Sequence, residues 1–102
     1  MNRRTRGLYL DLTIRLRQDE DDDVRATPEG LQVHGHLFAF IDGEALAVRL
    51  SPARGHDLVT RGQAEHHSDG NGWVTVVDTE LWNELADESH AYVGEPAVGG
   101  QS

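Results

Sequence analysis

The sequence predicts a small α+β domain in which an antiparallel sheet is covered by helices on one face. Three observations support this fold class: a hairpin pattern between Leu31 and Leu50, a β-branched run at residues 73–77, and two segments with helix-capping residues. Strands joined by a tight turn must be antiparallel, and helices that alternate singly with them cover a face of the sheet. We assign residues 1–95 of the 102 to one domain and expect a disordered tail at 96–102.

The N-terminal segment, residues 7–17, fits two patterns. Its five aliphatic side chains alternate with other residues at a period of two, which favours a strand; they are Leu8, Leu10, Leu12, Ile14 and Leu16. Leu8, Leu12 and Leu16 also fall on one stripe of a helix, with Tyr9 beside them. Both interpretations remain open at the level of the residue pattern.

The acidic run at residues 19–23 should be a solvated linker, and it lacks the ligand spacing and the glycine of a calcium-binding loop. The following Thr27-Pro28-Glu29-Gly30 sequence is typical of a turn that leads into the hairpin.

The hairpin pattern places Asp42 and Gly43 in a two-residue loop. This register pairs Ala39 with Leu46 and Leu37 with Val48. Because side chains alternate between the faces of a strand, one face is predicted to be the core; it holds Leu31, Val33, Leu37, Ala39, Ile41, Leu46, Val48 and Leu50. The opposite face holds His34, His36, Phe38, Phe40, Ala45, Ala47 and Arg49.

Two helices and a strand follow the hairpin. Ser51 is placed to cap a helix that begins at Pro52 and ends at Gly62. Residues 63–72 form either a loop or a short strand, and residues 73–77 form a strand. Asp78 or Thr79 caps a last helix that ends at Gly94. Its core stripe is predicted to contain Leu81, Leu85 and Tyr92, flanked by Trp82, Ala86 and Val93.

The formal net charge of −9 is unevenly distributed: residues 1–18 carry +4, residues 19–23 carry −5 and the remainder carries −8. This balance should repel phosphate backbones, so nucleic-acid binding is disfavoured. The chain has no cysteine, and its Arg-rich start is not followed by the apolar run of a signal peptide or a membrane span. We therefore expect a cytoplasmic protein.

Few residues indicate chemistry. His34 and His36 share a face two residues apart and could present two imidazoles to a metal ion. In the predicted register Arg49 lies opposite His36, and a cation there disfavours a metal ion. A third ligand would have to come from a residue such as His66, His67 or Glu65. Two surface histidines are the favoured interpretation, and no metal or cofactor is expected.

No catalytic signature is visible. The serines lack an identifiable base, and Gly70-Asn71-Gly72 precedes a strand rather than a helix, so it does not resemble a phosphate-binding loop. We therefore expect a protein that is not an enzyme.

Phe38 and Phe40 form the most informative part of the second sheet face. Two aromatic rings beside small and polar residues make a shallow apolar patch that could bind a partner or ligand. Burial under the N-terminal segment, under residues 63–72 or under a second subunit is the favoured alternative.

Three segments carry a resemblance to a known family: residues 31–40 (Leu-Gln-Val-His-Gly-His-Leu-Phe-Ala-Phe), residues 46–54 (Leu-Ala-Val-Arg-Leu-Ser-Pro-Ala-Arg) and residues 72–76 (Gly-Trp-Val-Thr-Val). With Trp82 in the last helix, they resemble TfoX/Sxy N-terminal-type domains and the related MmcQ/YjbR-like proteins. The resemblance covers residues 24–93 and implies a compact α+β domain that opens with a helix. It therefore favours a helix over a strand for residues 7–17.

Two departures from the family pattern limit this resemblance. Residues 26–30 stand where the family carries a Met-Phe-Gly motif, and Arg49 stands where lysine is usual. The family has no agreed catalytic residues, so the resemblance transfers no active site.

The leading hypothesis is a non-enzymatic domain that binds another protein or self-associates, in a regulatory setting, through a face made of His34, His36, Phe38, Phe40 and Arg49. One alternative is a module that binds a small ligand or metal through the His34 and His36 face. The other is a nucleic-acid-associated regulator, which the acidic charge disfavours.

Overall fold

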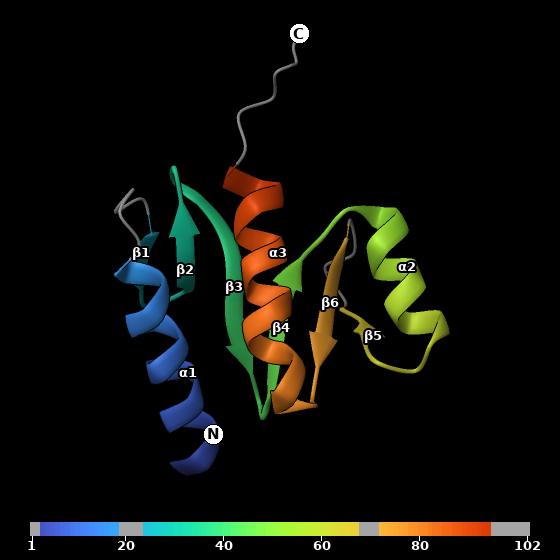
Figure 1. Ribbon diagram of the computed structural model, residues 1–102, viewed down its shortest axis with the longest axis horizontal. Coiled ribbons are helices and arrows are strands. Elements are labelled where there is room, and N and C mark those ends of the chain that lie inside the picture. Colours follow the sequence, from blue (N-terminus) through green and yellow to red (C-terminus); the bar gives the residue numbers. More distant parts are fainter. Residues whose placement is uncertain (1–2, 19–23, 68–71, 95–102) are drawn as a thin grey trace, which may run out of the picture.

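The computed structural model describes residues 3–18, 24–67 and 72–94. It contains a six-stranded antiparallel sheet with the strand order β1-β2-β3-β4-β6-β5 and helices packed on one face, which confirms the predicted α+β fold (Figure 1). The elements are α1 (Arg3–Arg17), β1 (Val24–Thr27), β2 (Gly30–Val33), β3 (His36–Asp42), β4 (Ala45–Arg49), α2 (Pro52–Thr60), β5 (Glu65–His66), β6 (Trp73–Val76), the 3₁₀ turn η1 (Thr79–Leu81) and α3 (Trp82–Gly94). The predicted linker at 19–23 and tail at 96–102 lie outside the described residues.

The helix layer has α3 at its centre, with α1 on one side and α2 on the other (Figure 1). Ion pairs join α3 to both neighbours: Arg15 of α1 lies 3.1 Å from Asp87, and Arg54 of α2 lies 3.0 Å from Glu88. The core lies between this layer and the sheet; it includes Leu12, Leu16, Val33, Leu46, Val48, Leu58, Val74, Val76, Trp82 and Leu85.

The N-terminal segment is a helix, as the family resemblance implied, and it begins at Arg3 rather than residue 7. Its buried side chains are Thr5, Leu12, Thr13 and Leu16. The alternating pattern did not decide the structure, because a helix can bury every fourth aliphatic residue and leave the others in solvent. Leu10 and Ile14 are accordingly 51% and 54% exposed.

The turn at Thr27-Pro28-Glu29-Gly30 is confirmed, and it joins β2 to β1, a strand that was not predicted. The hydroxyl of Thr27 accepts hydrogen bonds from the N–H groups of Glu29 and Gly30, both at 3.2 Å. These bonds satisfy the backbone N–H groups of Glu29 and Gly30 within the turn itself.

The predicted hairpin loop was wrong by one residue. Asp42 pairs with Ala45, so Gly43 and Glu44 form the loop and Ala39 pairs with Val48 instead of Leu46. Gly43 has a φ of +64° and is the first loop residue, as a type II′ turn requires. An Asp42-Gly43 loop of type I′ would instead have required a positive φ at an aspartate.

A β-bulge at Phe38 overturns the predicted face assignment in β3. Leu31 pairs with Ala39, whereas its neighbour Gln32 pairs with Leu37, so Phe38 is an extra residue. A bulge interrupts the alternation of side chains. Phe38 therefore joins Ala39 on the helix side, where its ring centroid lies 5.5 Å from that of His90 in α3.

Leu37 consequently lies on the side opposite Val48, and its predicted place in the core was wrong. It approaches Gly30 together with Phe40: a Cβ built on Gly30 would lie 3.0 Å from Cδ1 of Leu37 and 2.6 Å from Cβ of Phe40.

Ser89 of α3 supplies polar partners where the pairing of β3 with β4 ends. Its buried Oγ lies 2.7 Å from the carbonyl oxygen of Phe38 and 2.6 Å from that of Arg49, and it accepts a 3.2 Å hydrogen bond from the N–H of Arg49. One hydroxyl proton can be donated to only one carbonyl at a time. Ser89 thus replaces, with a side chain, backbone hydrogen bonds that the bulge removes.

The caps of α2 are confirmed. The Oγ of Ser51 accepts a 3.2 Å hydrogen bond from the N–H of Arg54, Pro52 is the first helical residue, and Gly62 follows the helix with a φ of +76°. Of the two alternatives for residues 63–72, a short strand forms at Glu65–His66 as β5; residues 68–71 lie outside the described residues.

Asp78 caps η1, which leads into α3. The predicted stripe of α3 is correct at Leu85, Trp82 and Ala86, but Tyr92 is 46% exposed and Ser89 is buried instead. The Nε1–H of Trp82 donates a 2.9 Å hydrogen bond to the carbonyl of Val76, which fixes the start of α3 against β6.

We expect Val48→Asp and Leu37→Asp to differ sharply in stability. Val48 is 0% exposed, so its replacement buries an unpaired carboxylate and should lower the free energy of unfolding by at least about 4 kcal/mol. Leu37 is half-buried on the other face, and we expect a loss of about 1–2 kcal/mol. Urea unfolding followed by circular dichroism measures both, and equal losses would contradict the bulged register.

Ser89→Ala should lower the free energy of unfolding by about 1–3 kcal/mol, because buried backbone groups of Phe38 and Arg49 lose their hydroxyl partner. Ser89→Cys is the matched variant that keeps a weak donor and acceptor of similar shape, and it should be less damaging. A Ser89→Ala protein as stable as the parent would show that the hydroxyl is dispensable.

Candidate functional site

The face of the sheet opposite the helix layer is the principal candidate surface. We call it the helix-free face and define it by Leu37, Phe40, Ala47, Arg49, Trp73 and Thr75. The strand pairing sets its membership, since Ala47 pairs with both Phe40 and Thr75, and Arg49 pairs with Trp73. The residues between them, such as Val74, point to the helix layer, where Val74 Cγ1 lies 3.3 Å from a Cβ built on Gly55 of α2.

Two aromatic side chains and an imidazole form a cluster on this face. The ring centroid of Phe40 lies 5.1 Å from that of Trp73 and 5.4 Å from that of His67. Ala47, the strand partner of Phe40, is fully buried, whereas Phe40 and Trp73 remain half-exposed. The cluster therefore presents apolar surface to solvent, while Ala47 beneath it is excluded from solvent.

His67 holds the cluster to the edge of the sheet. The backbone N–H of His67 donates a 3.0 Å hydrogen bond to the backbone carbonyl of Trp73, and Nε2 of its imidazole lies 3.2 Å from Oδ2 of Asp42. His67, which belongs to the segment 63–72, thus contacts Phe40, in agreement with one of the sequence-based alternatives; residues 68–71 of that segment lie outside the described residues. Phe38, by contrast, is covered by α3, an element that was not among them.

Arg49 adds a cation beside the aromatic cluster. It is half-buried, and its Nε is fully buried without a hydrogen-bond partner among the described residues. Its backbone is fixed by Ser89 from the opposite side of the sheet. A buried donor without a partner is unfavourable. Because this Nε is closed to solvent, an incoming acceptor would have to approach the part of the half-buried Arg49 side chain that remains accessible.

The five predicted face residues are not brought together. Phe40 and Arg49 lie on the helix-free face, but Phe38 is buried beneath α3. His34 lies in the turn between β2 and β3 with a φ of +53°, and Gly35 follows at +83°, the combination of a type I′ turn. His36, at the start of β3, is exposed.

Metal ligands do not converge either. Within the ranges that the structure describes, no group of three or more histidine, aspartate or glutamate side chains could hold a metal ion. Sequence reasoning did not place Trp73 on this face, and it named His67 only as a possible metal ligand and not as a contact of Phe40. The alternation of Trp73 with the core residue Val74 was a usable signal, whereas nothing local in the sequence links His67 to Phe40.

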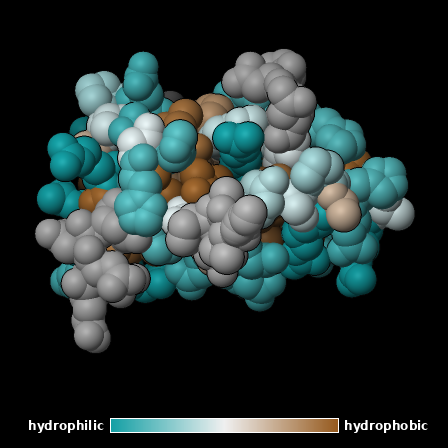
Figure 2. Space-filling view, turned by 90° about the horizontal axis from the view of Figure 1, so that it is seen from above, coloured by the Kyte–Doolittle hydropathy of each residue, from teal (hydrophilic) through white to brown (hydrophobic). Residues whose placement is uncertain are grey.

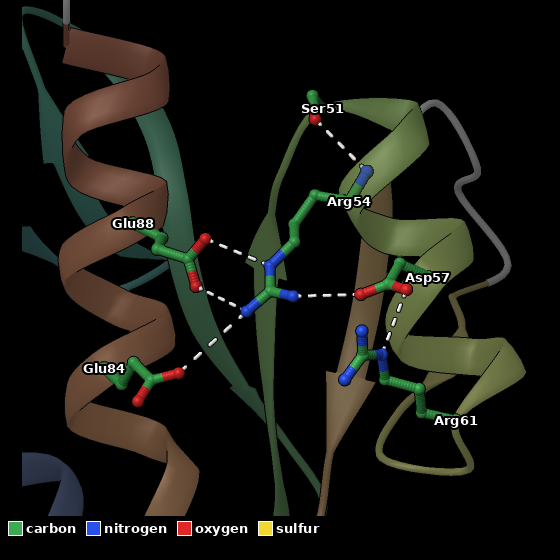
Figure 3. Close-up of polar contacts among 6 residues, drawn as sticks. All are labelled: Ser51, Arg54, Asp57, Arg61, Glu84 and Glu88. Carbon is green, nitrogen blue, oxygen red and sulfur yellow. Dashed lines mark hydrogen bonds and ion pairs between the residues drawn. The ribbon is translucent and has the colours of Figure 1, made fainter.

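A polar cluster with Arg54 at its centre joins α2 to α3 (Figure 3). The guanidinium of Arg54 donates to both carboxylate oxygens of Glu88 at 3.1 and 3.0 Å and to Asp57 at 3.1 Å, with Glu84 at 3.9 Å. Asp57 also accepts a 3.0 Å hydrogen bond from Arg61.

Charge-assisted hydrogen bonds perturb both ends of this cluster. The hydrogen bond with Glu88 is the main cause that raises the pKa of Arg54, and hydrogen bonding from Arg61, followed by the contact with Arg54, lowers the pKa of Asp57. These carboxylates are engaged as ion-pair acceptors, which assigns the cluster to holding two helices together rather than to acid–base chemistry.

Two shallow grooves lie elsewhere. One, of about 420 Å³, is lined by residues of the α2–β5 connection and the β6–η1 connection, including Ala64, Glu65, Val77 and Leu81. The other, of about 360 Å³, lies between Tyr9 of α1 and the turns at Glu29 and Gly43. Burial raises the pKa of Tyr9, so its phenol stays protonated at neutral pH and does not serve as a base.

The face of the molecule seen in Figure 2 is mostly hydrophilic. In the view from above, charged and polar side chains dominate and apolar atoms show in the hollow between them (Figure 2). Among the described helices, none has the length and apolar character needed to cross a membrane.

Comparisons with known proteins returned no match: no protein-family model fits the sequence, and neither a curated protein nor a solved structure is significantly similar to it. The resemblance to TfoX/YjbR-type domains therefore stays a prediction.

Replacing Arg54 should weaken the packing of α2 on α3. Because the ion pairs are partly exposed, we expect Arg54→Gln to lower the free energy of unfolding by at most about 1 kcal/mol in low salt, and by less in 1 M NaCl. Arg61→Gln, which breaks only the contact to Asp57 within one helix, is the matched control and should change less.

Folding lowers the pKa of Asp57 from its ordinary value of 3.8. The ionised carboxylate therefore adds to the free energy of unfolding above pH 3.8, and this contribution is lost as the pH falls below that value. Thermal melts at several pH values measure this. A difference between the two variants that persisted fully in acid would contradict the ion-pair account.

Proposed function

We propose that the protein is a non-enzymatic interaction module of the cytoplasm that binds an acidic segment of a partner protein across the helix-free face. The observation that supports this most directly is the partly accessible cation of Arg49 beside two half-exposed aromatic rings: Arg49 pairs with Trp73, and the ring of Trp73 lies 5.1 Å from that of Phe40. The resemblance of residues 24–93 to TfoX/YjbR-type domains is compatible with such a regulatory role.

The chemistry of this face favours a protein carboxylate as the ligand. Tryptophan and arginine are the side chains that most often dominate binding energy at protein interfaces. A guanidinium pairs with a carboxylate through two parallel hydrogen bonds, and the neighbouring rings can pack against the apolar part of the same segment. Nucleic acid is a poorer candidate because the chain carries a net charge of −9.

The shape of the face supports the same choice. Its side chains lie on three adjacent strands, β3, β4 and β6, which form a continuous surface rather than an enclosed cavity. Small-molecule sites are usually concave and bury most of the ligand. An extended or helical protein segment can contact Phe40, Trp73 and Arg49 together.

A displayed library of random peptides, selected on the immobilised full chain, tests this proposal. We expect the selected peptides to be enriched in aspartate or glutamate near an apolar residue. Binding should quench or shift the fluorescence of Trp73, since Trp82, the other tryptophan, is buried. Arg49→Gln and Phe40→Ser should each weaken binding of a selected peptide at least tenfold.

Tyr92→Ser is the matched control, because Tyr92 is an aromatic residue that is 46% exposed and lies on α3, in the helix layer. It should leave peptide affinity unchanged. Peptides that lack acidic residues, or that bind Arg49→Gln as tightly as the parent, would refute this function.

A further inference from the structure

Strand β5 covers only part of its neighbour β6 at one edge of the sheet (Figure 1). The pairing includes Glu65 opposite Thr75, and continuing this register by two residues would place Gln63 opposite Val77. The N–H of Gln63 instead donates a 2.9 Å hydrogen bond to the carbonyl of Leu58 in α2. The chain that precedes β5 therefore turns away from the sheet and leaves a gap beside the end of β6.

The groove in this gap adjoins the helix-free face. It has a volume of about 420 Å³ and lies between residues 62–65 on one side and Thr75, Val77 and Leu81 on the other. Thr75 belongs to the helix-free face, and Val77 follows it by two residues, so the side chain of Val77 continues that face beyond β6. A segment that lies across the helix-free face along β6 therefore reaches the groove.

Part of the groove is apolar. Ala64, Val77 and Leu81 supply this surface. Val77 is 71% exposed, the largest exposed fraction among the large hydrophobic side chains in the described part of the chain. Covering such surface is favourable. The methylene stem of a lysine or arginine can pack on apolar surface of this kind while its charged head stays beside polar groups.

The charge of the groove is negative. Glu65 and Asp78 both line it, and Asp78 accepts a 3.0 Å hydrogen bond from the N–H of Glu80, a third acid that is exposed. No ion pair joins Glu65 or Asp78 to a cation within residues 3–18, 24–67 and 72–94. Arg61, which adjoins the groove in sequence, lies 3.0 Å from Asp57. The groove is therefore complementary to a basic side chain.

The distance between the groove and Arg49 follows from the register. Arg49 pairs with Trp73, and Val77 lies four residues farther along the chain. At a rise of about 3.3 Å per residue, the two positions are about 13 Å apart. An extended segment beside β6 covers this distance with four residues, whereas a helical segment would need about nine.

We infer that the partner segment is extended and carries two opposite charges: an acidic residue that pairs with Arg49 and, four or five residues away, a lysine or arginine that enters the groove beside Val77. This inference rests on the proposed binding of an acidic segment to the helix-free face. Opposite charges at the two ends of the surface determine the direction in which the segment lies, because the reversed direction would bring like charges together.

The peptides selected on the full chain test the spacing. We expect lysine or arginine to be enriched four or five positions from the aspartate or glutamate. In a synthetic, fluorescein-labelled copy of one selected peptide, moving the basic residue by two positions should weaken binding about fivefold or more, as measured by fluorescence anisotropy.

The double variant Glu65→Gln/Asp78→Asn tests the groove. It should weaken binding of the selected peptide about fivefold or more, and it should leave unchanged the weaker binding of a peptide whose basic residue is replaced by glutamine. Both changes keep the shape of the side chain, and asparagine can still cap η1, so the thermal midpoint should stay close to that of the parent.

Asp11→Asn/Glu29→Gln is the matched control. It removes two exposed carboxylates from α1 and from the turn between β1 and β2, and it changes the net charge by the same amount. It should leave the affinity for the selected peptide unchanged. An equal loss of affinity in this control would show that only the net charge matters and would overturn the groove assignment.

Other results would also overturn the inference. Selected peptides might depend on Arg49 yet lack a basic residue at this spacing, carry it about nine positions away, or bind Glu65→Gln/Asp78→Asn as tightly as the parent. Each of these outcomes would exclude the extended, two-charge segment and leave the proposed function intact. Binding that does not depend on Arg49 would instead refute the proposed function, and the inference with it.

Discussion

The arrangement of this protein depends on the β-bulge at Phe38 and on the Ser89 hydroxyl that compensates for it. The extra residue interrupts side-chain alternation in β3, which places Phe38 beneath α3 and Leu37 on the opposite face. The strand pairing that the bulge removes would leave buried backbone groups without partners, and Ser89 supplies those partners from the helix layer. The same contacts fix the backbone of Arg49, so the position of the candidate binding residue follows from the packing of α3.

Local chemistry made much of the fold predictable from sequence. Ser51, Pro52 and Gly62 define α2 because capping and stopping a helix depend on a few adjacent residues. The bulge could not be predicted in this way, since residues 37–41 are all apolar and therefore carry no alternation that could reveal an interruption. The hairpin loop was misplaced by one residue because Asp42-Gly43 and Gly43-Glu44 both satisfy turn preferences, and only the pairing of whole strands distinguishes them.

The candidate site was only partly visible in the sequence. Phe40 and Arg49 were correctly placed on one face, because both lie beyond the bulge in the part of the hairpin where alternation holds. His34 was assigned to that face on the assumption that β3 extends through it, whereas it occupies the turn. The contact of His67 with Phe40 joins positions far apart in the chain, and it depends on the pairing of the short edge strand β5 with β6. The spacing of residues in the sequence does not predict a contact of this kind.

The backbone amide of Arg49 is hydrogen-bonded to the side chain of Ser89 in α3 rather than to a neighbouring strand, so its exchange with solvent depends on a different motion from that of its neighbours. In a regular sheet, the exchange of a buried amide proton with solvent requires separation of neighbouring strands. The N–H of Arg49 is instead held by the hydroxyl of Ser89, so movement of α3 away from the sheet is sufficient to release it. Its exchange rate therefore reports undocking of the central helix, while the amides of Ala39 and Val48 nearby report opening of the strands.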